Sequence, residues 1–422
     1  MPPDEIKPET SRVGNERAPA EHASGERISG ERGKGERCIF IIAGEPSGDA
    51  LGAELMDALR RHADGPVRFV GIGGEQMQAA GLKSLFPISE LAVMGLLEVL
   101  PHARKILQRI TQTVEAVFLS KPDVVITIDA PGFCFRVAKR LRAQSRETGS
   151  LPPLVHYVAP TVWAWKPKRA EKIAKIYDKL LVCLPFEPPY FEREGLSTSF
   201  VGHPVVTSPL RSGNGLDFRR KHGIGENAPV LSILPGSRRG EVSRLLPVFR
   251  DAVALLGERK SELVVVTPTV STVEHSVRTG MKDWPVPVHV VTGEDEKAGA
   301  FAASHVALAA SGTVGLQLGA AGVPSVIAYR LNPLTYQIVK RMVGVDYVNL
   351  INILLGRLEV PELLQGECQP NLLTDAVGKL FDDPHAAARQ RQAASEAVDM
   401  LRPPPAYKTP SDAAASAVLE LI

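Results

Sequence analysis

Short apolar runs alternate with longer stretches of helical spacing along most of the chain. In the stretch after the first run, Leu51, Leu55 and Leu59 fall on one stripe, which is the spacing of a helix that packs one face on a sheet. Strands that alternate with such helices form parallel sheets covered on both faces. The runs predicted as strands are Cys38–Ala43, Val67–Ile72, Val124–Ile128, Leu154–Val158, Lys179–Leu184, Val230–Leu234, Leu263–Thr267, Val288–Val291, Val306–Ala309 and Ser325–Ala328.

The alternation occurs in two series, separated by polar breaks that contain glycine. Gly202-His203-Pro204 follows the first series and Ser212-Gly213-Asn214-Gly215 precedes the second, so we interpret this region as a hinge. Ligands of open parallel sheets bind beyond the carboxyl ends of the strands, so two facing domains would place a site in the cleft between them. The predicted divisions are a disordered Gly-Glu-Arg repeat tail over 1–36, an N-terminal doubly wound domain over 37–205, a C-terminal doubly wound domain over 206–385 and a C-terminal helical segment over 386–422.

The composition narrows the classes of protein that fit this pattern. The chain has 422 residues, of which 44% are hydrophobic, and this is enough for two domains with sizeable cores. Its formal net charge is +2, so no overall field marks a nucleic-acid binder and any basic recognition is local. We interpret the cysteines as reduced core thiols of a cytosolic protein, with a disulfide or metal role as the weaker alternative. They are Cys38, Cys134, Cys183 and Cys368.

Targeting signals are not apparent in the sequence. The tail contains no stretch like the apolar core of a signal peptide. The longest uncharged run, Val306–Tyr329, contains four glycines and Pro324, so a buried helix followed by a strand fits it better than a membrane span. The expected location is therefore the cytoplasm, with at most a contact on one side of a membrane.

Two turns of the first series carry carboxylates directly after a predicted strand. The backbone amides of Gly44–Asp49 could receive a phosphate or a polar sugar group, with Ser47 or Asp49 capping the helix that follows. This turn has neither the P-loop nor the G-x-G-x-x-G pattern, and an ordinary capped helix is the alternative. Asp129 in Ile128–Phe133 is placed to act as a general base, with a simple turn former as an equal alternative.

Two turns of the second series suit phosphate binding. In Leu234–Glu241, backbone amides and Arg238 could hold a diphosphate. In Ala310–Gly315, small residues at a predicted helix start would allow close approach of the backbone to phosphate oxygens. Tight helix packing would also explain the glycines of the second turn, and both explanations can hold together.

Two further segments combine apolar or aromatic residues with basic ones. His156–Arg169 contains two of the three tryptophans, which could stack on sugars, lie at a membrane interface or pack in the core. The overlapping segment Lys166–Lys179 has six basic and two acidic residues, so it is either a solvated helix face or a surface that attracts anionic headgroups. Leu91–Leu100 is likewise either core or an apolar surface for acyl chains.

Taken together, the motifs resemble those of the lipid-A-disaccharide synthases in their order along the chain. The match runs from about residue 38 to the end and leaves the repetitive tail outside it. The Trp-Ala-Trp segment and the Ser-Gly-Asp turn are especially typical of that family. The motifs are Ala43–Asp49, Glu90–Gly95, Ile128–Pro131, His156–Trp165, Leu184–Glu187, Pro235–Arg238 and Ala310–Thr313.

This resemblance implies an inverting glycosyltransferase of the GT-B fold, in which two Rossmann-like doubly wound parallel-sheet domains face a central cleft. Such an enzyme transfers 2,3-diacylglucosamine from UDP-2,3-diacylglucosamine to 2,3-diacylglucosamine 1-phosphate (lipid X), which yields UDP and the β-1,6-linked lipid A disaccharide 1-phosphate. The N-terminal domain would bind the acceptor and lipid, and the C-terminal domain would bind the UDP-sugar. The resemblance implies no metal and no cofactor, and peripheral association with the cytoplasmic face of the inner membrane.

The resemblance also assigns roles to individual positions. Asp129 would take the proton from the acceptor 6-hydroxyl, and Arg238 with helix amides would stabilise the leaving UDP. The residues expected on the acceptor side of the cleft are Ser47, Gly48, Asp49, Trp163 and Trp165. Those expected to bind UDP are Gly236, Ser237, Arg238, Ser311, Gly312, Thr313, Gln317, Asn352 and Arg357. Those expected to contact the membrane or acyl chains are Val93, Met94, Leu96, Leu97, Lys168, Arg169 and Lys172.

Three positions depart from the family pattern. Family members often have Glu where Gln317 stands, and an amide keeps one acceptor oxygen for ribose hydroxyls but loses the charge. Gly132 and Ile351 replace an acidic residue and a proline found in some relatives. The alternatives are another UDP-sugar transferase or nucleotide-sugar epimerase of the same fold, or a non-catalytic protein that binds UDP-sugars or lipids.

Overall fold

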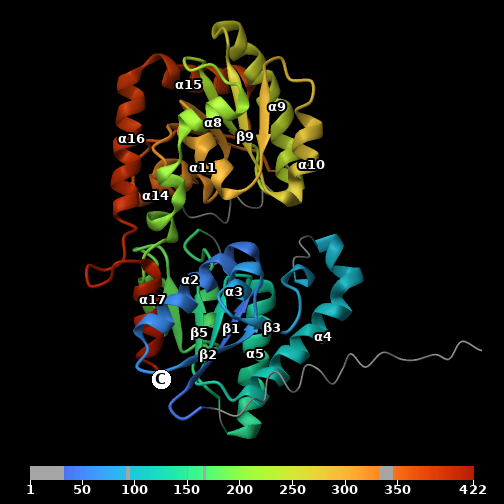
Figure 1. The fold of residues 1–422 in the computed structure, drawn as a ribbon, viewed down its shortest axis with the longest axis vertical. Coiled ribbons are helices and arrows are strands. Elements are labelled where there is room, and N and C mark those ends of the chain that lie inside the picture. The colour runs from blue at the N-terminus through green and yellow to red at the C-terminus, as the bar shows by residue number, and fades with distance from the viewer. Residues whose placement is uncertain (1–32, 92–95, 150, 165–167, 332–345) are drawn as a thin grey trace, which may run out of the picture.

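The computed structural model describes residues 33–91, 96–149, 151–164, 168–331 and 346–422. Two α/β domains lie one above the other along the long axis of the molecule (Figure 1). Each domain contains one parallel sheet with helices on both faces. This architecture confirms the fold class that the alternating pattern predicts.

The first domain contains seven parallel strands in the order β3-β2-β1-β4-β5-β6-β7. β1 pairs with β4, so the turns that follow these two strands lie side by side at the carboxyl edge of the sheet. The strands are β1 (Arg37–Ala43), β2 (Val67–Ile72), β3 (Lys83–Ser84), β4 (Val124–Ile128), β5 (Leu154–Tyr157), β6 (Lys179–Val182) and β7 (Ser197–Phe200). The helices are α2 (Pro46–His62), α3 (Glu75–Ala79), α4 (Leu96–Ser120), α5 (Pro131–Thr148), α6 (Arg169–Ala174) and α7 (Pro188–Glu192), with a 3₁₀ turn at Ile88–Glu90.

The second domain contains six parallel strands in the order β10-β9-β8-β11-β12-β13. β8 pairs with β11, so the turns after these two strands are also neighbours. The strands are β8 (Val230–Leu234), β9 (Val264–Pro268), β10 (Val288–Val291), β11 (Val306–Ala310), β12 (Ser325–Tyr329) and β13 (Glu362–Leu364). The helices of this domain are α8 (Gly215–His222), α9 (Arg239–Arg259), α10 (Ser271–Gly280), α11 (Glu294–Ala303), α12 (Val314–Ala320), α14 (Leu350–Leu355), α15 (Pro370–Asp382) and α16 (Pro384–Asp399), and α17 (Pro410–Leu419) follows them in the chain.

The apolar runs predict the interior of both sheets but miss strands at their edges. All ten predicted strands are present, with ends that differ by two residues at most. The missed strands β3, β7 and β13 each lie at the edge of a sheet. These three strands are covered on fewer sides and lack the apolar run of a buried parallel strand, whereas the fourth edge strand, β10, keeps three valines and is predicted. All four cysteines are free and buried, as expected for core thiols.

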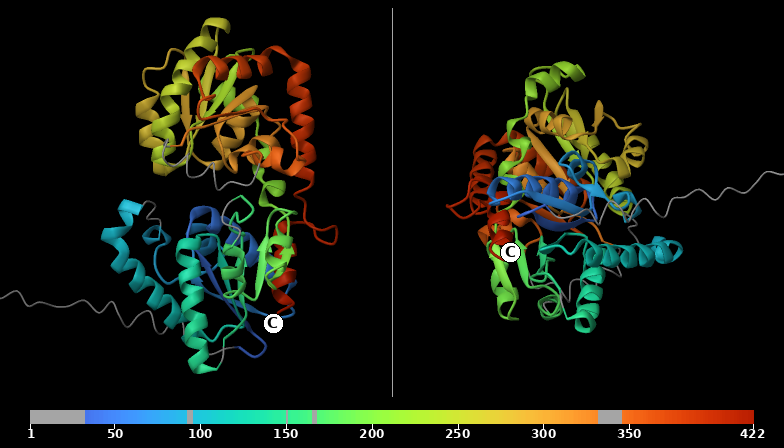
Figure 2. Two further views of the ribbon diagram at one scale, coloured as in Figure 1. Left: turned by 180° about the vertical axis from the view of Figure 1, so that it is seen from behind. Right: turned by 60° about the horizontal axis from the view of Figure 1, so that its bottom comes forward.

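Two segments, one around residue 203 and the other around residue 401, cross between the domains on the same side of the molecule (Figure 2). They are joined by a hydrogen bond in which His203 N–H donates to Leu401 O at 2.9 Å. Gly202 has a φ of +90°, and a Cβ there would lie 2.7 Å from Pro403 N, so only glycine fits this crossing. The break at Ser212–Gly215 differs from a free hinge, because its glycines pack against the backbone of α11.

The C-terminal helices divide between the two domains. α16 packs against α12 and α14 of the second domain, whereas α17 returns to the first domain and packs on α2. Asp412 anchors α17, because its carboxylate accepts hydrogen bonds from Arg61 Nη2 at 2.7 Å and lies 2.9 Å from His62 Nε2. It also forms a capping box with Thr409. The buried face of α17 consists of small residues: Ala413, Ala414, Ala415, Ala417 and Val418.

We predict that Asp412→Ala lowers the free energy of unfolding by about 1–3 kcal/mol at pH 7, because it removes a helix cap and leaves Arg61 without its carboxylate. Burial acts to raise the pKa of Asp412, but the hydrogen bonds from Arg61 and His62 outweigh it and hold that pKa below its ordinary value. The folded protein thus binds this proton less readily than the unfolded chain, so the stabilisation is present above pH 4 and is lost as the pH falls.

Denaturant unfolding of both proteins at pH 7 and pH 3 measures this effect. The exposed Asp399, which pairs with Arg402 at the end of α16, provides the control. We expect Asp399→Ala to change stability by less than about 0.5 kcal/mol. An Asp412→Ala variant as stable as Asp399→Ala at pH 7 would contradict the anchoring role.

Candidate active site

Asp129 lies at the carboxyl end of β4, where the chain turns into α5. Its N–H donates to Tyr157 O of the neighbouring strand at 2.9 Å. Asp129 and Ala130 have left-handed φ values of +47° and +43°, and two consecutive non-glycine residues in that region store strain. Pro131 then begins α5. The carboxyl group is therefore held between a strand end and a helix start by backbone that cannot easily relax.

Two carboxyl groups lie near each other at this edge of the sheet. The turns touch, since a Cβ on Gly44 would lie 2.5 Å from the Cβ of Ala130. Burial raises the pKa of Asp129, which is half-buried. Burial, and after it the charge of Asp129, raise the pKa of Glu45, whereas the charge of Arg238 acts in the opposite direction. Because Arg238 belongs to the second domain, this electrostatic interaction connects turns of the two domains.

The structure places the residues of the Gly44–Asp49 turn in different roles. Ser47 is exposed in the first turn of α2, where backbone N–H groups lack helical acceptors. Gly48 is buried, and a Cβ there would lie 3.4 Å from Ile128 O. Neither Ser47 nor Asp49 caps α2, which begins after Glu45 without a side-chain hydrogen bond.

Asp49 instead supports the start of a different helix, α3. The residue is 5% exposed, and its carboxylate accepts three backbone hydrogen bonds, from Gly74 N at 2.7 Å, Gln76 N at 3.0 Å and Met77 N at 3.1 Å. These bonds occupy both carboxylate oxygens. We therefore assign Asp49 a positioning role beneath the turn, in place of the direct contact with the acceptor that the resemblance implies.

The turn after β8 is organised by Glu241. Gly236 has a φ of +114°, and a Cβ there would lie 2.4 Å from a carboxylate oxygen of Glu241. That carboxylate accepts from Ser237 N at 3.2 Å and from the Tyr329 hydroxyl at 3.3 Å, and it lies 3.7 Å from an Arg238 nitrogen. The Arg238 side chain is 69% exposed. The guanidinium of Arg238 is therefore available to a ligand, while the turn that carries Arg238 is held in place by Glu241.

The turn after β11 presents small residues at the start of α12. Gly312 and Thr313 are exposed and Ser311 is half-buried. Gly312 has a φ of +145°, and no atom of the described residues lies within 4 Å of where a Cβ would be, so the backbone conformation itself requires glycine here. Gln317 is half-buried one turn further along α12.

Two residues expected to bind UDP, Asn352 and Arg357, instead form hydrogen bonds or ion pairs with other residues of the chain. Asn352 is fully buried, and its side-chain amide makes four hydrogen bonds to Glu359, Val360 and Glu362. All the hydrogen-bonding capacity of that amide is thereby used. In this structure the amide therefore has no donor or acceptor left for a ligand, whereas the resemblance assigns Asn352 to the UDP-binding residues.

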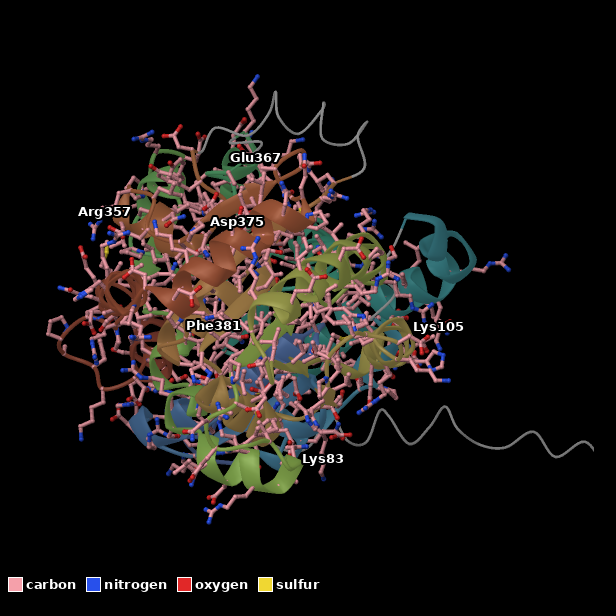
Figure 3. The ribbon with its side chains drawn as sticks, turned by 90° about the horizontal axis from the view of Figure 1, so that it is seen from above. Lys83, Lys105, Arg357, Glu367, Asp375 and Phe381 are labelled. Atoms are coloured by element: carbon pink, nitrogen blue, oxygen red, sulfur yellow. The ribbon has the colours of Figure 1, made fainter. Side chains whose placement is uncertain are left out.

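Arg357 lies at the edge of the molecule in the view from above (Figure 3). Its guanidinium pairs with Glu359 at 3.0 Å and with Glu396 of α16 at 2.6 Å. The structure therefore places this arginine in a surface ion-pair group. A direct contact with UDP would require it to leave both carboxylates.

Trp163 lies where the two domains meet and is held by a buried carboxyl group. Its Nε1 donates to Glu187 Oε1 at 3.1 Å, and its ring packs edge-on against Phe186 with centroids 5.2 Å apart. Trp163 and Phe186 border an apolar cluster formed largely by the second domain. Glu187 also accepts from Leu184 N at 3.0 Å. The sequence contains a signal for this role, since Glu187 is the one carboxylate in an otherwise apolar stretch.

The expected membrane residues are only partly within the described ranges. Trp165, Val93 and Met94 fall outside the described residues, and the structure describes only the backbone of Leu96 and Leu97 in α4. Lys168 and Lys172 are exposed at α6, and Arg169 is half-buried beside them. Among the described residues, no helix combines the length and the apolar character needed to cross a bilayer.

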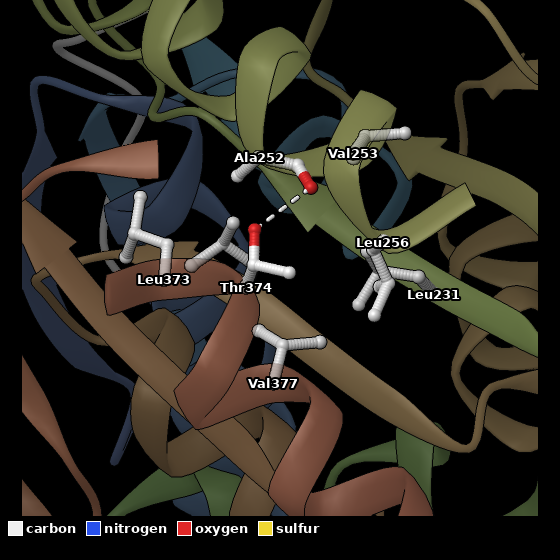
Figure 4. Close-up of a pocket in the computed structure, with 8 residues that line it drawn as sticks. Leu231, Ala252, Val253, Leu256, Leu373, Thr374 and Val377 are labelled. Carbon is white, nitrogen blue, oxygen red and sulfur yellow. Dashed lines mark hydrogen bonds between the residues drawn. The ribbon is translucent and has the colours of Figure 1, made fainter. Parts of the chain in front are cut away.

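The described part of the chain offers little outside these turns. It has no group of three or more His, Cys, Asp or Glu side chains arranged to hold a metal ion. A small apolar pocket lies between α9, α15 and the second sheet, where the Thr374 hydroxyl donates to Ala252 O at 3.1 Å (Figure 4). Its lining comes from core residues, so it is a packing gap inside the second domain.

Two doubly wound domains of this kind define the class of GT-B proteins, and solved structures share the fold. A UDP-GlcNAc 2-epimerase from Neisseria meningitidis bound to UDP-GlcNAc is similar with a TM-score of 0.58 and 13% identity, covering 91% of this chain and 98% of that chain. A glycosyltransferase from Rickettsia africae is similar with a TM-score of 0.55 and 12% identity, covering 92% of this chain and 98% of that chain. At such identities the likeness concerns the fold alone.

The sequence comparisons define the family. The model of the lipid-A-disaccharide synthetases matches residues 39–417. The lipid-A-disaccharide synthase of Rhodospirillum centenum is 51% identical over 384 residues, which cover 91% of this chain and 94% of the relative. The chain therefore belongs to the lipid-A-disaccharide synthetase family and is a glycosyltransferase. This result confirms the resemblance on which the site predictions rest.

Glu187 provides a test of the domain junction through the pH dependence of stability. Burial raises the pKa of its carboxyl group to about 7, although hydrogen bonds from Leu184 and Trp163 act to lower it. The folded protein therefore holds a proton that the unfolded chain has lost above about pH 4.5. The carboxyl group favours folding most at low pH, and that contribution declines as the pH rises through 7.

Because an amide does not titrate, we predict that the stability of Glu187→Gln relative to the wild type shifts by about 1–3 kcal/mol in favour of the variant between pH 5 and pH 8. Denaturant unfolding at four pH values measures the shift. Glu192→Gln, at an exposed position in α7, is the matched control and should give a flat difference. Parallel curves for Glu187→Gln and the wild type would show that Glu187 does not titrate in this range.

Proposed function

We propose that this glycosyltransferase transfers 2,3-diacylglucosamine from UDP-2,3-diacylglucosamine to the 6-hydroxyl of 2,3-diacylglucosamine 1-phosphate. The products are UDP and the β-1,6-linked disaccharide 1-phosphate. The observation that carries the proposal is the family membership, combined with a half-buried carboxyl group, Asp129, held on a strained backbone beside Glu45, whose charge interacts with both Asp129 and Arg238 of the other domain.

In this proposal Asp129 acts as the general base. It accepts the proton of the acceptor 6-hydroxyl as that oxygen attacks the anomeric carbon, so the bond to the UDP oxygen breaks and the configuration inverts. Burial raises the pKa of Asp129, which makes its carboxylate a stronger base. The negative charge of Asp129 raises the pKa of Glu45, so a proton on Glu45 is favoured while Asp129 is ionised.

The second domain would hold the nucleotide and stabilise the charge that develops on it. Arg238 can donate two parallel hydrogen bonds to phosphate oxygens, and the first-turn amides at Ser311–Thr313 add neutral donors. Gly236 and Ser237 present further backbone near that arginine, and Gln317 would accept from a ribose hydroxyl. Ser47 and Gly48 remain on the acceptor side of the proposed site, where Trp163 supports the junction.

Membrane contact in this proposal is peripheral and at the cytoplasmic face of the inner membrane. Two acylated substrates must reach the cleft, so a surface that attracts anionic lipid headgroups would bring the enzyme to them. The exposed cations at α6 support this interpretation, and the apolar 91–100 segment is the second candidate surface.

A direct test is UDP release by the purified protein from UDP-2,3-diacylglucosamine, with and without 2,3-diacylglucosamine 1-phosphate, and with a parallel reaction in EDTA. Acceptor-dependent, EDTA-resistant release with a disaccharide product is the expected result. UDP-sugar binding without acceptor-dependent release would instead indicate another acceptor or a binding role.

We predict that Asp129→Asn lowers kcat by roughly 10²–10⁴-fold, because an amide cannot accept the hydroxyl proton. UDP affinity should change by less than about threefold, since the proposed contacts to UDP come from the other domain. Steady-state kinetics and calorimetric titration with UDP measure the two effects. The control is Asp178→Asn, immediately before β6 at the amino edge of the same parallel sheet, opposite the edge that holds Asp129. An unchanged kcat in Asp129→Asn would remove Asp129 from its role.

We predict that neutralising Lys168, Arg169 and Lys172 together weakens binding to anionic vesicles by about tenfold or more, because each cation near such a surface contributes about 1 kcal/mol. Vesicle sedimentation at low and high salt measures this effect. A variant with Arg250, Arg259 and Lys282 of the second domain neutralised has the same loss of charge and should bind as the wild type does. Unchanged binding in the first variant would favour the 91–100 segment.

A further inference from the structure

One buried hydrogen-bond donor beside the turn after β11 finds no acceptor in the described part of the chain. Asn349 precedes α14 and is 1% exposed, and its Nδ2 has no hydrogen-bond partner among the described residues. The orientation of the amide is set by its other atom, because Oδ1 accepts from Ile351 N at 2.8 Å. Buried donors without acceptors are rare in native proteins. This one therefore requires a physical explanation.

The backbone around Asn349 is fixed, so the amide cannot simply turn toward an acceptor elsewhere. The carboxylate of Glu362 in β13 accepts the N–H groups of Val348 and Asn349, each at 2.9 Å. The same carboxylate accepts from Asn352 Nδ2 at 2.8 Å. Because the backbone and Oδ1 of Asn349 are both engaged, Nδ2 is held at one place.

That place is beside the first turn of α12. A Cβ on Gly315 would lie 2.9 Å from Nδ2 of Asn349, so the glycine provides the space that the amide fills. The Ser311 hydroxyl donates to Val348 O at 3.3 Å, which ties the same segment to the start of the turn. The buried donor thus lies next to the backbone that is proposed to bind phosphate oxygens.

We infer that Nδ2 of Asn349 donates a hydrogen bond to the diphosphate of the bound UDP-sugar, and that Asn349 is a nucleotide-binding residue. The inference rests on the proposed function of the Ser311–Thr313 turn. A diphosphate supplies the acceptor oxygens that Nδ2 lacks. When no ligand is bound, an uncharged amide donor can stay buried without an acceptor at a lower free-energy cost than a buried cation. The donor complements the exposed Arg238, which reaches the phosphates from the turn after β8.

Calorimetric titration with UDP and with uridine tests this assignment, because only UDP carries the phosphates. Asn349→Ser keeps a helix-capping oxygen but replaces the amide donor Nδ2 with a shorter hydroxyl that does not reach the same place, and should weaken UDP binding by about 5–10-fold. Asn349→Asp keeps the cap but places a negative charge near the phosphates, and should weaken UDP binding by more than about 30-fold. Uridine affinity should change by less than about twofold in both variants.

Asn214→Ser is the matched control, since Asn214 caps α8 through hydrogen bonds from Leu216 N and Asp217 N. It should bind UDP as the wild type does. Gly315→Ala, which places a methyl group against the amide, provides a second variant if the substitutions at 349 fail to fold.

The outcomes separate the inference from the proposed function on which it rests. Unchanged UDP binding in Asn349→Asp, or equal losses for UDP and uridine, would overturn the role of Asn349 and leave the nucleotide site intact. A wild-type protein that does not bind UDP would remove both.

Discussion

The contact between Gly44 and Ala130 is the constraint on which the rest of the site depends. The turns after β1 and β4 leave neighbouring strands at the same edge, and any side chain at position 44 would collide with Ala130. Contact this close is possible only because one turn has no Cβ and the other takes a left-handed backbone at Asp129 and Ala130. Parallel pairing thus brings together a strained carboxylate and a glycine turn that lie far apart in the sequence.

A layer of carboxylates and amides beneath the exposed groups holds the turns in place. Asp49 fixes the start of α3, Glu241 organises the turn that carries Arg238, and Glu362 clamps the segment before α14. Each accepts backbone N–H groups, and those that Asp49 and Glu362 accept are buried or half-buried and would otherwise lack partners. The groups available to ligands are therefore positioned by other polar residues that are themselves fully used.

The difference between groups that face a ligand and groups that support them limits how much of the structure can be predicted from the sequence. Interior strands are predictable because burial on both faces leaves an apolar run, while the edge strands β3, β7 and β13 leave none. Residue type and motif place Asp129 at a strand end, but they do not distinguish a polar side chain that faces a ligand from one that caps a neighbouring helix. Asn352 and Asp49 show this limit, because their partners come from separate segments whose proximity depends on the fold.

The return of α17 to the first domain has a consequence for the order in which the chain can fold during synthesis. β1 to β7 leave the ribosome first, yet the apolar face of α2 is covered by residues 410–419, which are made last. The first domain therefore waits for the second to be synthesised before its own surface is closed. Until α17 is made, that face of α2 has no covering helix, so the first domain can be closed only after the second has been synthesised.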